Sequence, residues 1–481
     1  MNSIIWLVAI PLLGALLCTV FPRLANRIGW MFAAGNMLAA LLVMHTVSQE
    51  GAFHYVIGGW SQGLGIALFA DSLTALMVVM SAIIALAVSI YSTAYFTDTK
   101  KQAFYWPLWL LLLTALNALF VSADLFNLYV TLELLGLAAA ALTAMGGSKE
   151  ALSAAIRYLL IGLIGSLTFL AGVVLVYTAY GTLDIAVLTQ QFQNNKVSWA
   201  IATLMTLGLM IKAALLPMHF WLPPAHANAP APVSAVLSAL VVKAAIYLML
   251  RLWPDIFYPL ANIGISYVLG GLGAAAIMWG SYQALRAQRI KLLAAYSTVA
   301  QVGYLFLGLS LIIVLPDGEL RHAVMVGVVL LALTHAFAKA ALFLAAGVIM
   351  QRGGHDRISD LDGTAQTLPV TTFTLALACV ALIGLPPSGA FLGKWQLLTV
   401  LLHEGLWFWI IVVLSGSLLS AAYAFRLLGH AFGKKNIPHK RLAIGLEELP
   451  ALVLSLIATL VLAFASAPVA KFIQPLSGVS Q

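Results

Sequence analysis

The sequence has 481 residues, of which 62% are hydrophobic and only 8% are charged, whereas an average soluble domain carries about 25% charged residues. This composition excludes a water-soluble globular protein and predicts an all-α, polytopic membrane protein. The net charge of +8 then depends on where basic residues lie relative to the bilayer, so it does not imply nucleic-acid binding. Cys18 and Cys379 lie in apolar runs and predict neither a disulfide framework nor a metal site.

Apolar runs follow one another along the chain, each with roughly the 20 residues that a hydrocarbon core about 30 Å thick requires. We expect about fourteen spans, at residues 3–22, 29–48, 66–96, 103–121, 124–145, 152–180, 198–222, 229–251, 258–285, 291–314, 322–350, 370–402, 406–432 and 449–470. Several of these runs are long enough to tilt or to break within the membrane.

The loops between the spans differ in their content of basic residues, and this difference predicts the orientation. With the N-terminus outside, fourteen Lys and Arg residues, Lys291 among them, fall in inside loops. Only four fall in outside loops and the C-terminal tail, namely Lys196, Arg251, Arg321 and Lys471. This asymmetry favours a multi-pass protein of the plasma (inner) membrane with both termini outside. One missed helix would exchange inside and outside loops after it and remove the asymmetry.

Charged residues inside the apolar spans are the main functional signal, because a charge at that depth costs roughly 2.5–3.5 kcal/mol on insertion scales. Six basic residues lie there: Arg157, Lys212, Lys243, Lys339, Lys394 and Arg426. Glu133 lies about ten residues into its span, near the midplane, and we expect it to pair with one of the lysines. A pair that opens and closes can release and recapture protons. The structural alternative is a static lock between helices.

Three histidines add capacity for proton relay, since histidine titrates near neutral pH. His219 and His226 bracket a proline-rich segment, and His335 precedes Lys339 by four residues, which places the two on one helical face. The alternative is that these histidines are hydrogen-bonded core residues. No metal site is predicted, because the histidines lack ligand spacing with acids or thiols.

Two expected spans, the seventh and the twelfth, are interrupted by prolines at LPMHFWLPPAHANAPAP and IGLPPSGAFLGKW. Irregular backbone at membrane depth is tolerated only where protein or a water-filled cavity covers it. Matching broken helices are typical of transporters built from repeats. We therefore expect two inverted five-helix repeats, with the chain divided into a three-helix flank at 1–102, repeats at 103–257 and 258–440, and a C-terminal helix at 441–481.

Five motifs follow in order: SADLFNLYVTLELL, LMIKAALLPMHFWLPPAHANAPAPVSAVLSALVVKAAIYLMLR, RIKLLAAYSTVAQVGYLFLGL, LTHAFAKAALFLAAG and GLPPSGAFLGKWQLL. Together they resemble the antiporter-like proton-translocating subunits shared by respiratory complex I, membrane-bound hydrogenases and Mrp-type sodium/proton antiporters. The resemblance covers nearly the whole chain. Within that family, the DLFNLYV run and Lys394 are most similar to the D subunit of the Mrp antiporter.

The resemblance implies roles for the charged residues. Glu133 matches the essential glutamate of the fifth span, and Lys212 matches its partner lysine. Lys243 matches the basic residue of span 8, and His335 with Lys339 matches the central pair of the second repeat. Lys394 matches the span-12 residue that, in the family, passes protons toward the exit side.

This chain departs from the family pattern at two places. Arg157 stands where many members have a lysine. The broken segment reads PPAHANAP where an aspartate commonly follows the first proline. We keep Arg157, His219 and His226 as candidate relay residues.

The expected function is that of a proton-translocating subunit of a multi-subunit cation/proton (Na⁺/H⁺) antiporter, with other membrane subunits as partners and Glu133 gating a midplane chain of lysines. The alternative is a pump subunit of a complex I-like NADH-quinone oxidoreductase or a membrane-bound hydrogenase. No flavin, quinone or iron-sulfur motif is recognisable, so we expect no cofactor and no enzymatic activity of the chain alone. A stand-alone solute carrier fits less well, because the family arrangement places the charges in a line.

Overall fold

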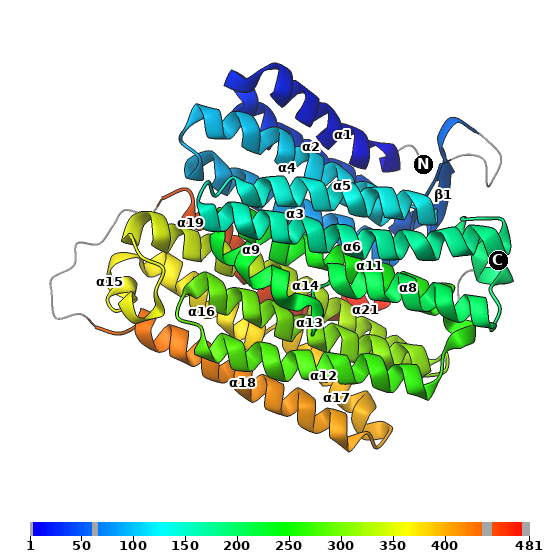
Figure 1. The fold of residues 1–481 in the computed structure, drawn as a ribbon. Helices are drawn as coiled ribbons and strands as arrows, with labels where there is room; N and C mark the ends of the chain where they lie inside the picture. Colours follow the sequence, from blue (N-terminus) through cyan, green and yellow to red (C-terminus); the bar gives the residue numbers. More distant parts are fainter. Residues whose placement is uncertain (1–2, 60–65, 435–444, 474–481) are drawn as a thin grey trace.

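The computed structural model describes residues 3–59, 66–434 and 445–473. Long helices run side by side across one slab, with β1 (Phe53–Val56) at one end of the slab and α15 (Thr364–Thr367) at the other (Figure 1). Helices are the expected choice for an apolar chain, because each helix satisfies its own backbone hydrogen bonds within lipid. The prediction of an all-α, polytopic membrane protein is confirmed.

The longer helices are α1 (Ser3–Val20), α2 (Ala25–Glu50), α3 (Ser72–Tyr95), α4 (Thr99–Val121), α5 (Leu125–Ala144), α6 (Lys149–Tyr180), α8 (Lys196–Lys212), α11 (Val242–Asp255), α12 (Ile263–Arg286), α13 (Ile290–Val314), α14 (Glu319–Val348), α16 (Pro369–Ile383), α17 (Gly389–His403) and α18 (Trp407–Ala431). Short α-helices are α7 (Ile185–Gln191), α9 (Leu222–Asn228), α10 (Ala231–Val236), α19 (Glu448–Leu456), α20 (Leu462–Phe464) and α21 (Ser466–Phe472). Short 3₁₀ turns are η1 (Pro22–Leu24), η2 (Ile57–Gly59), η3 (Met218–Trp221), η5 (Tyr258–Leu260) and η7 (Ile358–Asp360). Three π-helical turns are η4 (Leu237–Val241), η6 (Ile349–Gly353) and η8 (Ile457–Val461).

Eleven helices in the described part of the chain are long and apolar enough to cross a membrane, or twelve if the bent α19–α21 segment is one span. The two other expected spans are the ones interrupted by prolines. The seventh is represented by α8 and α9, and the twelfth by α16 and α17. The total of fourteen and the inverted repeat stay predictions.

The third expected span, residues 66–96, began too early. Residues Ala67–Ala70 form strand β2, which pairs antiparallel with β1 in a two-stranded sheet. Helix α3 begins only at Ser72, because the carboxylate of Asp71 accepts a hydrogen bond from the Thr74 amide at 2.9 Å and caps the helix.

Both proline-rich interruptions separate helices in the structure. Helix α8 ends at Lys212, and the chain then turns through Ala214, which has a φ of 54°. Helix α16 ends at Ile383 and is followed by Gly384 with a φ of 80°. Glycine adopts this left-handed backbone readily, whereas other residues such as alanine seldom do. These breaks bring free helix ends into the interior of the slab.

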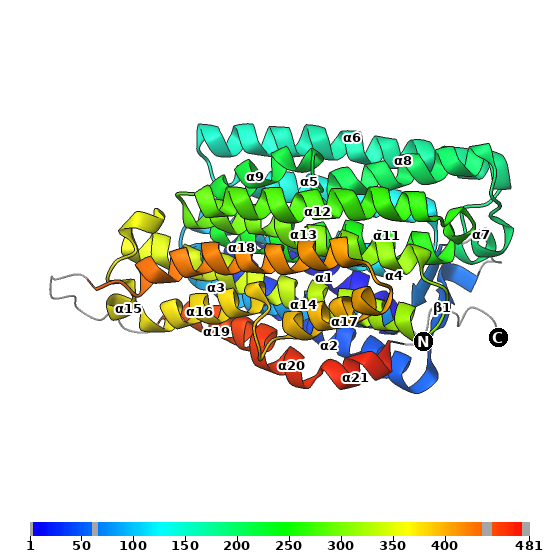
Figure 2. The same ribbon diagram turned by 90° about the horizontal axis from the view of Figure 1, so that it is seen from below.

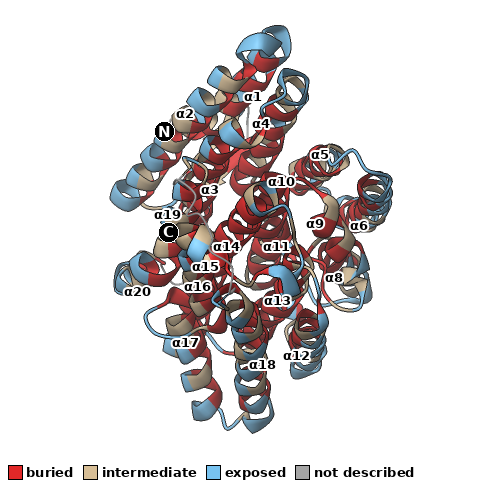
Figure 3. Cartoon of the chain, turned by 90° about the vertical axis from the view of Figure 1, so that its left-hand side faces the viewer, coloured by how far each residue is buried: buried red, intermediate tan, exposed pale blue. Residues whose placement is uncertain are grey.

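The centre of the slab is made of α11, α13 and α14, which other helices surround. The apolar stretches of the α10–α11 segment and of α14 are entirely buried inside the protein, and the apolar stretch of α13 is nearly so. Buried residues gather in the middle, and exposed residues lie along α1, α2, α6, α12 and α18 (Figure 3). Charged side chains on the central helices therefore face protein and not lipid.

Candidate functional site

The expected pairing of Glu133 is with Lys212, the last residue of α8. Their atoms Oε2 and Nζ lie 3.9 Å apart, and the side chains are 21% and 10% exposed. The amine also lies 3.5 Å from the carbonyl oxygen of Leu132. Because 3.9 Å is longer than a hydrogen bond, the two side chains form an ion pair but no hydrogen bond. A small movement of either side chain would strengthen or break it.

Small residues and an aromatic anchor position Lys212. A Cβ atom on Gly136 or Gly162 would lie only 3.1 or 3.7 Å from the amine, so these glycines leave room for it. Beyond the break, the indole of Trp221 donates a hydrogen bond to the carbonyl of Ile211 at 3.0 Å. The same carbonyl also accepts a hydrogen bond from the Ala214 amide at 3.1 Å, so two donors hold it at the end of α8. The interruption is thus held in a defined place.

Lys243 follows the π-helical turn η4 and is 1% exposed. Its amine donates a hydrogen bond to the carbonyl of Ser238 at 2.5 Å. The Ser238 hydroxyl in turn lies 2.8 Å from the Thr298 hydroxyl on α13. Single π-turns occur often at functional sites, and this one holds the carbonyl that receives the lysine.

Lys339 lies in the middle of α14 and is fully buried. Its amine donates to the carbonyl of Ala294 at 2.8 Å and to the hydroxyl of Ser297, both on α13. One turn earlier, both ring nitrogens of His335 have no hydrogen-bond partner among the described residues. The same holds for His226, whose ring stacks on another aromatic ring. A hydrogen-bonded water would satisfy these nitrogens.

Lys394 lies on α17, just after the second interruption. Its amine donates to the carbonyl of Ile383 at 2.9 Å and to the hydroxyl of Ser417 at 3.0 Å. It also lies 4.3 Å from the centre of the Tyr304 ring, a cation–π contact. The Ile383 carbonyl is available because α16 ends there. The break therefore supplies a ligand for the lysine.

Helix α13 carries a polar stripe that sequence reasoning did not single out. Ser297 and Thr298 contact Lys339 and Ser238, as described above. Gln301, one turn further on, donates to the carbonyl of Leu382 at 2.9 Å. These positions, together with Tyr304, recur at three- to four-residue spacing in an otherwise apolar helix. That periodicity was the signal that could have identified the stripe.

The helices that carry the four lysines form a continuous row. Helix α8 packs on α11, α11 on α13, α13 on α14, and α14 on α17. Figure 2 and Figure 3 show α8 toward one edge and α17 toward the other, with α11, α13 and α14 between them. Among the described residues, only Lys212 of the four lysines has a carboxylate within ion-pair distance. A buried charge without a counter-ion is costly, so all four are not expected to be charged together.

The remaining predicted residues lie apart from this row. Arg157 is exposed on α6. His219 accepts a hydrogen bond from the indole of Trp279 at 3.3 Å on an exposed part of the surface. Arg426 donates to backbone carbonyls at the end of α12, at 2.9 Å for Ala287, which is a capping role.

Three basic residues that the orientation count assigned to loops are buried instead: Arg251, Lys291 and Arg321. Arg251 lies within α11, which continues to Asp255, and is 8% exposed. Lys291 is the second residue of α13, is 2% exposed, and donates to the carbonyl of Ala229. The assignment of Arg251 failed because hydropathy alone ended the eighth span at the arginine, although a carboxylate lies beside it.

The family described as "NADH:quinone oxidoreductase/Mrp antiporter, TM" matches residues 122–420, which is more than half of the chain. The chain belongs to this family. The matched region extends from before Glu133 to beyond Lys394, so all the proposed translocation residues lie within it. The family resemblance predicted from the sequence motifs is confirmed.

Individual relatives come from two branches of this family. The chain is 35% identical over 446 residues to the N subunit of an NADH-quinone oxidoreductase from Desulforudis audaxviator, covering 89% of this chain and 86% of that protein. It is 26% identical over 481 residues to the D subunit of a Na(+)/H(+) antiporter from Alkalihalophilus pseudofirmus, covering 98% and 95%. A chain in the structure of the Mrp complex from Dietzia sp. superposes with a TM-score of 0.89 at 25% identity, covering 100% of this chain and 99% of that one.

Proposed function

We propose that this chain is the proton-translocating membrane subunit of a multi-subunit Na⁺/H⁺ antiporter in the plasma membrane, with both termini outside. The observation that carries the proposal is the Glu133–Lys212 pair, which is formed but not closed by a hydrogen bond. It stands at the start of a row of buried lysines. A relative named as the D subunit of a Na(+)/H(+) antiporter, together with the fold shared with a chain of an Mrp complex, supports other membrane subunits as partners.

The proposed sequence of steps begins when Glu133 approaches Lys212 and stabilises its protonated amine. When the carboxylate moves away, the buried ammonium loses its counter-ion and releases the proton. Lys243 accepts that proton on its amine and passes it to Lys339 and then to Lys394, and each lysine is neutral again after its transfer. Carbonyl and hydroxyl groups hold each amine in place between transfers.

The test is proton flux driven by a Na⁺ gradient in vesicles that contain the assembled complex. Glu133→Ala and Lys212→Ala are each expected to abolish the flux while the subunit still assembles. The matched control is Lys196→Ala, at the exposed first residue of the same helix as Lys212, and its flux should equal that of the wild type. Normal flux from either of the first two variants would contradict the proposal.

A second candidate function is that of a proton pump powered by electron transfer in neighbouring subunits. It is favoured by the 35% identity to the N subunit of an NADH-quinone oxidoreductase. The purified complex distinguishes the two candidates once its subunits are identified by mass. Small antiporter subunits together with flux driven by Na⁺ support the first candidate, and redox subunits together with flux driven by an electron donor support the second.

A further inference from the structure

A cavity of about 120 Å³ lies at the end of α11 that faces the β1–β2 hairpin. Its walls include ionisable and hydroxyl-bearing side chains, among them His54, Asp71, Tyr247, Arg251 and Asp255. In the proposed orientation this end of the molecule is the outside. None of these residues has a part in the lysine row described above, so the cavity calls for a separate explanation.

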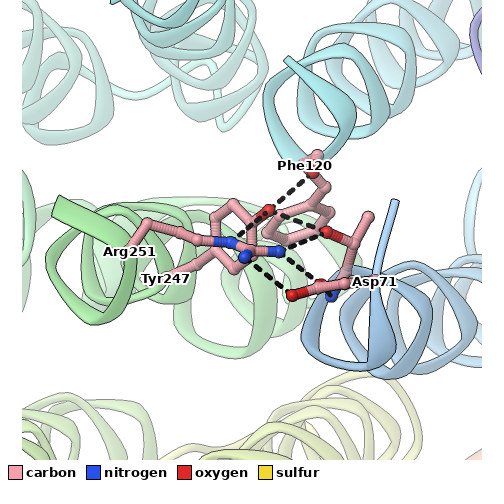
Figure 4. Close-up of polar contacts among 5 residues, drawn as sticks. Asp71, Phe120, Tyr247 and Arg251 are labelled. Carbon is pink, nitrogen blue, oxygen red and sulfur yellow. Dashed lines mark hydrogen bonds and ion pairs between the residues drawn. The ribbon is translucent and has the colours of Figure 1, made fainter. Parts of the chain in front are cut away.

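Arg251 is the centre of a hydrogen-bonded network (Figure 4), and Asp71, Tyr247 and Arg251 of this network line the cavity. Its guanidinium binds both carboxylate oxygens of Asp71, with 2.7 Å from Nη1 to Oδ2. It also donates to the hydroxyl of Thr74 at 2.8 Å and to that of Tyr247 at 3.3 Å. The Tyr247 hydroxyl donates to the carbonyl of Phe120 at 2.7 Å. The network thereby connects α3, α4 and α11.

The network stands on the same side of α11 as Lys243. Lys243, Tyr247 and Arg251 are spaced by four residues, which places them as successive neighbours on one helical face. At 1.5 Å per residue, the α-carbons of Lys243 and Arg251 are separated by about 12 Å along the axis. This is a short route from a proposed proton carrier to the outside. A proton that followed it would bypass Lys339 and Lys394.

The guanidinium is a permanent and immobile charge on that route. Arginine is not deprotonated in proteins, and two aromatic rings flank this one, with 5.1 Å to the Phe69 ring and 5.4 Å to the Tyr247 ring. Burial raises the pKa of Asp71, but the charge of the adjacent Arg251 guanidinium and the hydrogen bonds from Arg251 and Thr74 together hold the pKa below its usual value. The carboxylate therefore stays ionised near neutral pH and keeps the arginine in position.

We infer that Arg251 is an electrostatic barrier which prevents protons from leaking between Lys243 and the outer cavity. In membrane pores a fixed arginine charge excludes protons and cations. The Tyr247 hydroxyl does not offer a bypass, because its own proton is held by the Phe120 carbonyl. Arg251 thus affects the direction of proton flow without carrying a proton itself. The inference rests on the proposed function, since it takes Lys243 as a proton carrier.

The test measures passive proton flux in proteoliposomes of the whole complex, under a K⁺ diffusion potential and without a Na⁺ gradient. Arg251→Gln is expected to raise the leak severalfold, because loss of the guanidinium leaves the Asp71 carboxylate without its counter-charge and lowers the energy of a proton near it. Adding Lys243→Ala to Arg251→Gln should return the leak to the wild-type level. A purely structural role of Arg251 would not produce this dependence on Lys243.

The control is Arg321→Gln, which removes another buried arginine charge, one bound to Asp317 on the short segment before α14. Its leak should equal that of the wild type. If Arg251→Gln does not assemble, Arg251→Met is the second variant, because it removes the same positive charge, keeps much of the side-chain volume and should raise the leak in the same way. Wild-type leak in an assembled Arg251 variant, or a leak that persists without Lys243, would overturn the inference.

This experiment separates the barrier from the proposed antiport. A leak that depends on Lys243, together with normal Na⁺-driven flux in Lys212→Ala, would reject the antiport mechanism and keep the barrier. Loss of driven flux in Lys212→Ala without any leak in Arg251→Gln would reject only the barrier.

Discussion

The two interrupted helices present their lysines to different surroundings. Lys212 ends the first helix of its pair and faces a carboxylate at 3.9 Å across a partly exposed contact. Lys394 lies beyond its break, is 5% exposed, and is held by a carbonyl, a hydroxyl and an aromatic ring. A carboxylate that moves can change the proton affinity of its lysine, whereas fixed neutral ligands cannot.

This difference suggests a division of labour between the two regions. The Glu133–Lys212 region has the loose contact and the counter-ion needed for control of proton entry. The Lys339 and Lys394 region has short hydrogen bonds to backbone and hydroxyl groups, which suits transfer along a fixed path. Buried lysines that rest on neutral ligands pass between charged and neutral forms without breaking an ion pair. Substitutions confined to one region should leave the contacts of the other region intact.

The largest effect is expected from replacing the fully buried lysine of the second region. Lys339→Met should abolish Na⁺-driven proton flux, because the apolar side chain fills the space but cannot carry a proton. It should not lower the thermal unfolding temperature of the complex, since replacing a buried charge by an apolar group of similar volume is often neutral or stabilising. Lys149→Met, at the exposed start of α6, is the control for both measurements. Retained flux in Lys339→Met would remove this residue from the path.

A smaller effect is expected from crowding the first region. In Gly136→Ala the new Cβ would lie 3.1 Å from the amine of Lys212, so the lysine must shift relative to Glu133. We expect driven flux to fall by about three- to tenfold, which corresponds to a free-energy cost on the order of 1 kcal/mol for displacing the pair. Gly271→Ala on α12 is the matched control, because a Cβ there meets nothing within 4 Å. Equal flux in the two alanine variants would mean that the pair tolerates displacement.

The comparison also shows which parts of the site a sequence can reveal. Glu133 and Lys212 could be paired in advance because charges at that depth are rare and must find partners. The ligands of Lys394 could not, because one is a backbone carbonyl that is available only where α16 ends, and another is a hydroxyl on the separate helix α18. Proline positions predicted that both breaks exist. They did not predict which lysine would precede its break and which would follow.

The network of Arg251 illustrates a different gap. Asp71 lay near the start of the expected third span and Arg251 at the end of the eighth, so the predicted orientation already put both at the outside level. Hydropathy treated the first as part of an apolar run and the second as a loop residue. The carboxylate is held by a local cap of α3 and follows strand β2, whose formation depends on its pairing with β1. Segment composition contains no direct record of such contacts.

The smallest effect is expected from removing one neutral ligand in the second region. Ser417→Ala deletes the 3.0 Å hydrogen bond to the amine of Lys394 and leaves the bond to the Ile383 carbonyl. One such bond contributes about 1 kcal/mol, so driven flux should change by about fivefold or less, measured in the same vesicles. Ser415→Ala, two residues earlier on α18, is the control, because that hydroxyl bonds to Val412 and Met278 and not to a lysine. Complete loss of flux in Ser417→Ala would show that the hydroxyl itself carries the proton, and the fixed ligands of the second region would then be part of the path and not only its support.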